Sequence, residues 1–168
     1  MRLYRACDAG EEDGVALVEF ALVVPILLVI MVAMLDFGKA LNYWIDESQL
    51  SSAGARLAAV NNWPGKTSTD GALALATYIR GQADTSELRN GGSSATKAQV
   101  CIVFPTNPTT GTSGRVADPV TVTVATTYRW LSLLSSRFGG LPATTAVKSA
   151  STMRLEAQWS STATTCSS

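Results

Sequence analysis

The feature that most constrains this chain is a single carboxylate inside an otherwise apolar segment. Val15 to Leu35 is a run of 21 residues in which Glu19 is the only charged side chain. At about 1.5 Å of rise per residue, a helix over this run is roughly 31 Å long, close to the thickness of the hydrocarbon core of a membrane. A charged side chain within such a helix costs about 2.5–3.5 kcal/mol on insertion scales and usually has a functional partner. The segment therefore predicts a membrane-spanning helix whose Glu19 needs a positive charge.

Two interpretations of Glu19 follow from its position. In the first, the segment is a plain signal anchor and Glu19 has no role. In the second, a protease cuts between Gly14 and Val15, which creates a new α-amino group four residues before Glu19. A second helix, shifted by about one turn, would then present its own Glu19 to that ammonium group. An ordinary secretory signal fits less well, because its apolar region would be shorter and would end in a small-x-small site.

Further residues stand at fixed distances from Glu19. Phe20 follows it directly, Pro25 interrupts the apolar run, Asp36-Phe37-Gly38 comes after it, and an Ala-rich segment with one arginine follows at 53–59. Together with Gly14, this pattern over residues 14–60 resembles the TadE-like proteins, which are minor pseudopilins of the bacterial tight-adherence (Tad/Flp) pilus. Phe20 stands where the family often has tyrosine, and it keeps the aromatic ring.

The resemblance implies a division into a cytoplasmic leader peptide (1–14), a transmembrane and stem helix (15–60) and an extracytoplasmic pilin-like head (61–168). It implies cleavage by a prepilin peptidase at Gly14 and Val15, a charge-pairing role in assembly for Glu19 with Phe20, and a helix exit at Asp36 and Gly38. Because Pro25 lacks a backbone donor, we expect a helix kink there. The expected partners are major and minor pilin subunits, the peptidase, the inner-membrane pilus assembly machinery and membrane lipid. Because major subunits of these pili are short, the large head implies a minor pilin that acts at the tip or in assembly initiation, and hence in adherence. The alternative is an unprocessed, single-pass anchored binding module outside the cytoplasm.

The basic residues before the apolar run indicate its orientation. Arg2 and Arg5 precede it, and only Lys39 lies close behind it, which places the N-terminus in the cytoplasm. We therefore expect a single-pass protein of the inner (cytoplasmic) membrane that later reaches the pilus and cell surface.

The three cysteines are Cys7, Cys101 and Cys166. Cys7 would leave with the leader, so the mature chain would keep an even pair outside the cytoplasm, where disulfides persist. A bond between Cys101 and Cys166 would fix the Ser/Thr-rich C-terminal tail, which otherwise is expected to be flexible. Two unpaired thiols remain the alternative.

Periodicity predicts an α+β fold. Apolar residues at three- and four-residue spacings continue the first helix to about Val60, and Asn61 to Gly65 ends it. Tyr43 and Trp44 are expected at the membrane interface. A second helix is expected from Gly71 to Gly81 with Asp70 as its cap. Strands are expected at 98–104, 120–128 and 144–156, and a short helix at 130–134. The simplest arrangement is a small antiparallel sheet on the exposed half of the long helix.

Composition argues against catalysis. The chain has no histidine, which excludes Ser-His-Asp sites and histidine-ligated metals, and no cofactor or metal is expected. The carboxylates of the head show no paired spacing, so we expect no enzyme. Nine basic and five acidic residues after residue 60 give a surplus of +4. This surplus is scattered along the sequence, which indicates a solvated surface and no nucleic-acid partner.

Overall fold

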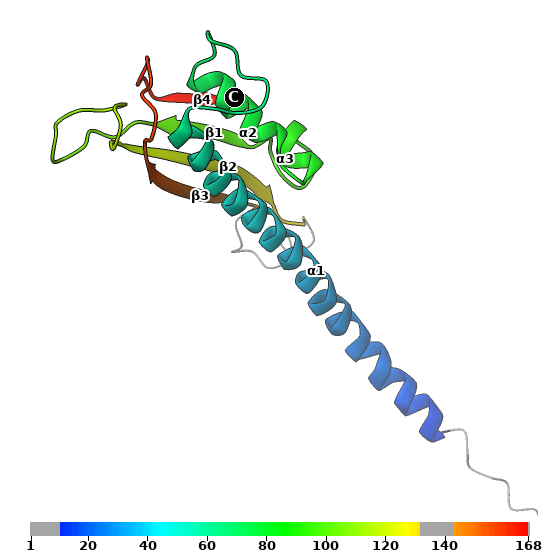
Figure 1. Cartoon of the computed structure of the whole chain (residues 1–168). Coiled ribbons are helices and arrows are strands. Elements are labelled where there is room, and N and C mark those ends of the chain that lie inside the picture. The colour runs from blue at the N-terminus through cyan, green and yellow to red at the C-terminus, as the bar shows by residue number, and fades with distance from the viewer. Residues whose placement is uncertain (1–10, 132–142, 168) are drawn as a thin grey trace, which may run out of the picture. The chain divides into compact units, whose positions relative to one another are not determined.

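The structure, a computed structural model, describes residues 11–131 and 143–167 (Figure 1). The chain divides into two compact units, Met1–Gly38 and Lys39–Ser168. The boundary lies within the first helix, α1 (Glu11–Val60), which contributes its N-terminal part to the first unit and its C-terminal part to the second. We describe each unit separately.

The described part of the first unit is a single run of helix. Val, Leu, Ile, Ala and Met dominate it, and such residues favour a helix in an apolar environment, where every backbone polar group must be satisfied internally. Gly14–Val60 contains a stretch long and apolar enough to cross a membrane, and none of that stretch is buried within the protein. The helix continues through Pro25, although proline lacks the N–H that would bond to the preceding turn. The bend that we expect at Pro25 stays a prediction.

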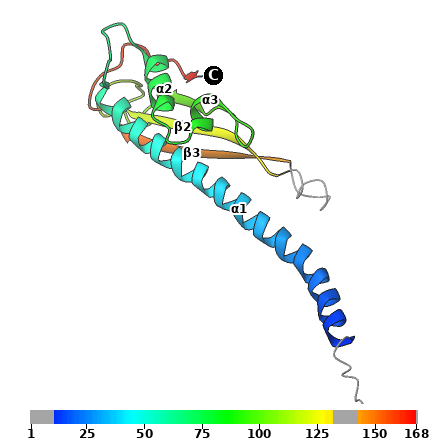
Figure 2. The ribbon, with the colours of Figure 1, turned by 90° about the vertical axis from the view of Figure 1, so that its right-hand side faces the viewer.

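The second unit has two layers, with helices on one face of a sheet. Its elements after α1 are α2 (Ala72–Gly81), α3 (Ser86–Asn90), β1 (Gln99–Val103), β2 (Pro119–Arg129), β3 (Thr144–Arg154) and β4 (Thr165–Ser167). The four strands form one antiparallel sheet in the order β3-β2-β1-β4. Figure 2 shows α2 and the C-terminal part of α1 on the same side of this sheet. The α+β fold and the antiparallel sheet beside the long helix are as the sequence predicts.

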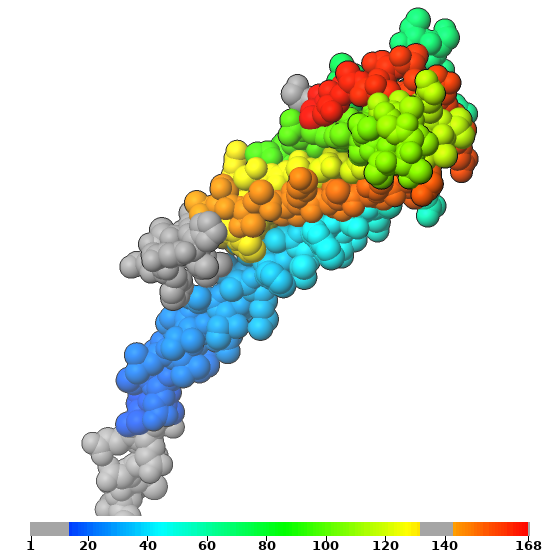
Figure 3. Space-filling model, turned by 90° about the vertical axis from the view of Figure 1, so that its left-hand side faces the viewer, coloured from blue at the N-terminus to red at the C-terminus, as the bar shows by residue number. Residues whose placement is uncertain are grey.

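Buried and partly exposed side chains alternate along β2, and this alternation shows which face of the sheet the helices cover. Val120, Val122, Val124, Thr126 and Tyr128 are buried, and the residues between them are partly exposed. Because successive side chains of a strand point to opposite faces, the valines form the inner layer against the helices. The opposite face carries polar side chains, and Figure 3 shows β3 and β2 side by side at that surface.

Gly54 allows α1 to approach the rest of the core closely. A Cβ at this position would lie 2.7 Å from the Cδ1 of Ile79 on α2 and 3.1 Å from the Cγ1 of Val122 on β2. Ala55 and Ala58 continue the small-residue surface and are fully buried. The Ala-rich segment therefore serves close packing within the second unit.

The end of α1 is as the sequence predicts, and it is stabilised by side chains from the C-terminal segment. Asn61 takes a positive φ of 50°, which ends the helix. The Lys66 ammonium donates to the backbone and side-chain oxygens of Asn61 and lies 4.9 Å from the centre of the Trp63 ring. Trp63 stacks on Trp159 at 6.3 Å, and the indole N–H of Trp159 donates to the carbonyl of Ala58. A cation near exposed carbonyls at a helix C-terminus is favourable.

Several local predictions need correction. Asp70 does not cap α2, because its carboxylate accepts a hydrogen bond from the Thr67 N–H and so closes a turn before the helix. The helix α3 and the strand β4 were not expected. The short helix expected at 130–134 is absent at Trp130 and Leu131, and its remainder lies outside the described residues. The three expected strands are present, and their ends agree with the expected ones to within two residues.

Candidate assembly site

Glu19 lies on the lateral surface of the apolar part of α1. The residue is exposed, and it forms no hydrogen bond or ion pair within the described part of the chain. Val15 is four residues earlier, on the same face of the helix, and its side chain is 60% exposed. A carboxylate without a partner on a helix that is otherwise apolar all round is costly in a membrane. The arrangement therefore suits pairing with a cation supplied by another molecule.

The bond between Gly14 and Val15 lies near the start of α1. The helix begins at Glu11, so this bond is in its first turn, where helix ends fray most readily. A Cβ placed on Gly14 would meet no atom within 4 Å, so the backbone here is open to approach. Removal of residues 1–14 would leave Val15 as the first residue of the remaining helix.

The side chains that follow Glu19 project outward. Phe20 is 69% exposed, and most of the apolar residues after it are exposed as far as Leu35, whereas Val24, Val32 and Ala33 are partly exposed. Side chains on every face of the helix are thus available to lipid or to neighbouring helices. Asp36 is buried, whereas Gly38 has open space where a side chain would lie. The helix continues without a break through both residues to Val60, as expected, and the exit from the membrane at Asp36 and Gly38 stays a prediction.

Tyr43 is a core residue and not an interfacial one, contrary to our expectation. It is only 4% exposed, packs against Tyr128 of β2 with ring centres 5.6 Å apart, and donates a hydrogen bond of 2.7 Å to the Glu87 carboxylate of α3. Burial, and then the hydrogen bond to Glu87, raise the pKa of Tyr43 well above its usual range. Trp44, its neighbour in sequence, is about half exposed.

Asp46 holds the start of α3. Its carboxylate accepts hydrogen bonds from the N–H and hydroxyl of Thr85, at 3.0 and 2.9 Å, and a longer one from the Asp84 N–H. Thr85 is the residue that precedes the helix, so Asp46 satisfies backbone donors that a helix start leaves free. The pairing explains why a five-residue helix forms at this place.

Glu47 is a functional candidate that sequence reasoning missed. It is completely buried, and neither carboxyl oxygen has a hydrogen-bond partner among the described residues. Burial and the neighbouring Asp46 charge raise the pKa of Glu47 from 4.5 to about 8, and the approach of the Thr126 backbone, which falls short of hydrogen-bonding geometry, offsets only part of this. The only sequence signal is a carboxylate at an inward-facing helix position, which periodicity alone does not distinguish from a solvated one.

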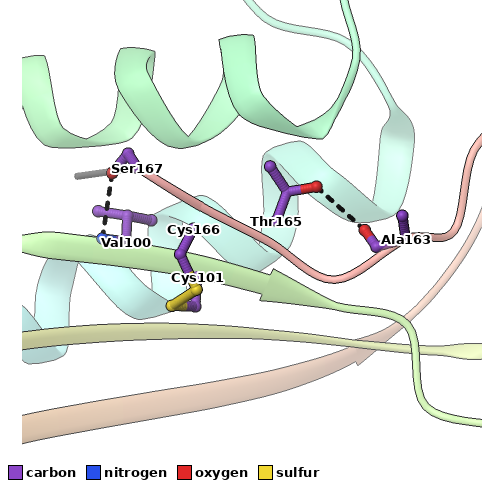
Figure 4. The surroundings of a disulfide bond; sticks show 6 residues. All are labelled: Val100, Cys101, Ala163, Thr165, Cys166 and Ser167. Atoms are coloured by element: carbon purple, nitrogen blue, oxygen red, sulfur yellow. Dashed lines mark hydrogen bonds between the residues drawn. A yellow bond between two sulfur atoms is a disulfide. The ribbon is translucent and has the colours of Figure 1, made fainter.

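A disulfide joins Cys101 of β1 to Cys166 of β4, the pair that the cysteine count predicts. The two residues are direct partners in the antiparallel register, with Cα atoms 4.0 Å apart. Figure 4 shows both side chains on the side of the sheet away from α2. The backbone N–H of Val100 donates to the hydroxyl of Ser167, which is buried. The residues around Cys166 are therefore an ordered edge strand, where we expected a tail fixed at only one residue.

Asp118 orders the loop that precedes β2. It is 1% exposed and accepts hydrogen bonds from the side chains of Asn107, Thr110 and Thr112 and from the N–H of Arg115. Burial alone would raise the pKa of Asp118, but these hydrogen bonds outweigh it and lower the pKa. The residues that the structure describes contain no group of three or more side chains suited to bind a metal ion.

Comparison with known proteins bears on the first helix. No curated protein and no solved structure matches the chain. Residues 14–56 match the model of the TadE-like protein family. This stretch contains Gly14, Glu19, Pro25, Asp36 and Gly38, on which the sequence resemblance rests. The N-terminal part of the chain is thus similar to TadE-like proteins, and this similarity supports a pilin-like protein associated with a Tad pilus.

Proposed function

We propose that this chain is a minor pilin of a Tad/Flp pilus that is processed after Gly14. The observation that carries the proposal is the unpaired, exposed carboxylate of Glu19 within an apolar helix that matches the TadE-like family. A helix that serves only as a membrane anchor needs no charged side chain within its apolar segment.

In the proposed assembly, Glu19 of one subunit pairs with the Val15 ammonium of its neighbour. Processing creates this cation four residues from Glu19 on the same helix face, so two parallel helices offset by about one turn bring the opposite charges together. When helices pack side by side and exclude water, an unpaired carboxylate costs several kcal/mol or takes up a proton. The pair therefore fixes the axial offset between stems, a role in which buried charges are well supported.

The remaining parts of the proposal follow from this arrangement. The N-terminus lies in the cytoplasm, residues 15–35 cross the inner membrane, and the head lies outside the cytoplasm. Its partners are a prepilin peptidase, the inner-membrane assembly machinery, membrane lipid, and other pilin subunits. The folded unit Lys39–Ser168 is large for a filament subunit that forms the shaft. We place the protein at the tip or in initiation of the fibre, where it would serve adherence.

One observation favours a second candidate, a permanently anchored module that keeps residues 1–14. The helix α1 begins at Glu11 and includes the Gly14–Val15 bond, and an intact helical turn resists proteolysis until it opens. The two candidates differ in the mature N-terminus.

Intact-mass analysis of the membrane-extracted protein distinguishes them. We expect a chain that begins at Val15 in a strain with an active prepilin peptidase, and the heavier precursor in a strain without it. Gly14→Phe should give the precursor in both strains, whereas Gly38→Phe, at an open position away from the bond, should be processed normally. A full-length chain in the peptidase-active strain would support the anchored module.

A further inference from the structure

The strands of the sheet carry three cations and no carboxylate. The cations are Arg129 on β2 and Lys148 and Arg154 on β3. Across the described structure, residues 119–131 and 143–155 contain no Asp or Glu at all. In the sequence, the segment between β2 and β3 separates Arg129 from the other two cations. In the sheet, β2 and β3 are adjacent strands. Part of the excess positive charge after residue 60, which is scattered along the sequence, therefore lies on two neighbouring strands.

All three cations lie on the same face of the sheet. The register pairs Lys148 with Ala125, Arg154 with Pro119 and Arg129 with Thr144. Arg129 alternates with the buried side chains of β2, and the two β3 cations alternate with side chains that are partly buried. The face opposite the helices, which we call the outer face, thus carries Arg129, Lys148 and Arg154. The three are exposed, and neither Lys148 nor Arg154 forms an ion pair in the described part of the chain. Figure 3 shows this surface, with β3 in orange beside β2 in yellow.

Between the cations, the outer face carries threonine hydroxyl groups and small alanine side chains. Threonines 121, 123 and 127 of β2 and 144 and 152 of β3 share this face, and the hydroxyls of Thr121 and Thr152 hydrogen-bond at 2.8 Å. At about 3.3 Å per residue, Arg154 lies roughly 20 Å from Lys148 along β3, and the position of Thr144 lies a further 13 Å away. The cations are thus spread along an extended line.

A hollow of about 360 Å³ adjoins one end of this line. Arg154 and Pro119 line it together with Asn107 and Thr110 of the loop that Asp118 orders. Asp118 adds no free acceptor to the hollow, because it is buried and accepts hydrogen bonds from that loop. The loop is therefore preorganised, and Arg154 is the one charged side chain among the described residues that line the hollow.

The nearest carboxylate in sequence beyond β3 does not oppose these cations. The backbone N–H of Glu156 donates to the carbonyl of Ala59 on α1, so the chain has turned to the helix side at this residue. Among the described strand residues, the outer face thus carries positive charges and no negative one.

From this surface we infer that the outer face binds an acidic polysaccharide, a chain of sugars that carry carboxylates. Cations in a line attract a polyanion, threonine hydroxyls hydrogen-bond to sugar hydroxyls, and the hollow receives one sugar ring. The described outer face of the strands has no aromatic ring on which bases would stack, which disfavours single-stranded nucleic acid. It also has no large apolar side chain other than Val103 to enter a lipid layer. The inference rests on the proposed extracytoplasmic head, since such a polymer lies outside the cell.

Binding of the purified full chain in detergent to polygalacturonate, measured by interferometry over a range of salt concentrations, tests the inference. We expect binding that weakens as salt rises, and no binding to neutral dextran. Lys148→Gln and Arg154→Gln should each lower the affinity about fivefold and reduce the slope of log affinity against log salt by about one. Arg56→Gln removes an exposed cation from α1, away from the outer face, and should leave both quantities unchanged.

Three results would overturn the inference. They are equal losses for Arg56→Gln and Arg154→Gln, equal binding to dextran, and tighter binding to duplex DNA than to polygalacturonate at the same salt concentration. Because this measurement uses no peptidase and no pilus, a failed processing experiment with intact binding would reject the pilin proposal alone.

Discussion

The hydroxyl of Tyr43 donates a hydrogen bond of 2.7 Å to the carboxylate of Glu87 and so ties α1 to the short helix α3. The sequence predicts Tyr43 at the membrane interface, yet its side chain is only 4% exposed. We expect Tyr43→Phe to destabilise the second unit by about 1.5–3 kcal/mol, because it leaves a charged acceptor without its donor.

Urea unfolding of the full chain in detergent, followed by tryptophan fluorescence, measures this loss. Tyr78→Phe is the matched control, because the Tyr78 hydroxyl makes no hydrogen bond within the described residues. Equal stability of Tyr43→Phe and Tyr78→Phe would show that the bond contributes nothing.

Glu47 should make stability fall as the pH rises. Its pKa is about 8 in the folded chain against 4.5 as the unperturbed value, so between these values the folded state holds a proton that the unfolded state has lost. The stabilisation is complete below pH 4.5 and is lost as the pH rises through 8, at a rate of at most about 1.4 kcal/mol per pH unit.

Glu47→Gln removes this titration, so its stability relative to the wild type should increase from pH 5 to pH 8. Urea midpoints at three pH values measure the change. Glu156→Gln, at an exposed position, should follow the wild type. Parallel pH profiles for Glu47→Gln and the wild type would mean that Glu47 is ionised in the folded protein.

The disulfide should stabilise the chain and hold β4 in place. Closing a loop with a sequence separation of 65 contributes roughly 4 kcal/mol in the chain-entropy model. The double change Cys101→Ala with Cys166→Ala should lower stability by up to about this amount and raise hydrogen exchange at Val100, whose N–H bonds to Ser167. Non-reducing mass analysis should find the wild type two hydrogens lighter than its reduced form. Free alkylation of both thiols without reductant would contradict the prediction.

Glu19→Ala should separate assembly from insertion. The change removes a cost of insertion, so membrane extraction, the fold of the second unit and the disulfide should be retained. Co-purification with other pilins should fail in a strain that lacks the native copy, as should fibres if this subunit initiates them. Phe20→Ala changes the neighbouring exposed ring without removing a charge, and it should co-purify at a higher level than Glu19→Ala. Normal assembly of Glu19→Ala would remove the pairing role.

The sequence predicts the long helix and the central strands because their signals are local. Alternating Val and Thr in β2 and the Asn61 to Gly65 stop need no partner to be recognised. The elements missed depend on distant residues. The helix α3 is started by Asp46, and β4 forms because Cys166 and Ser167 meet β1. The same applies to charge: Lys148 and Arg154 join Arg129 on one face only through the register of β2 and β3, which periodicity does not reveal.

The position of β4 has a consequence for the order in which this protein is completed. During synthesis, Cys101 leaves the ribosome 65 residues before Cys166. The edge of β1 that pairs with β4 therefore has no hydrogen-bond partner until β4 has been synthesised. Until then, an oxidant can react with the unpaired thiol of Cys101, and another unfolded chain can pair with the free edge of β1. Premature termination between Trp159 and Thr165 would therefore yield a protein that contains nearly all of its core but keeps an unpaired cysteine and an open sheet edge.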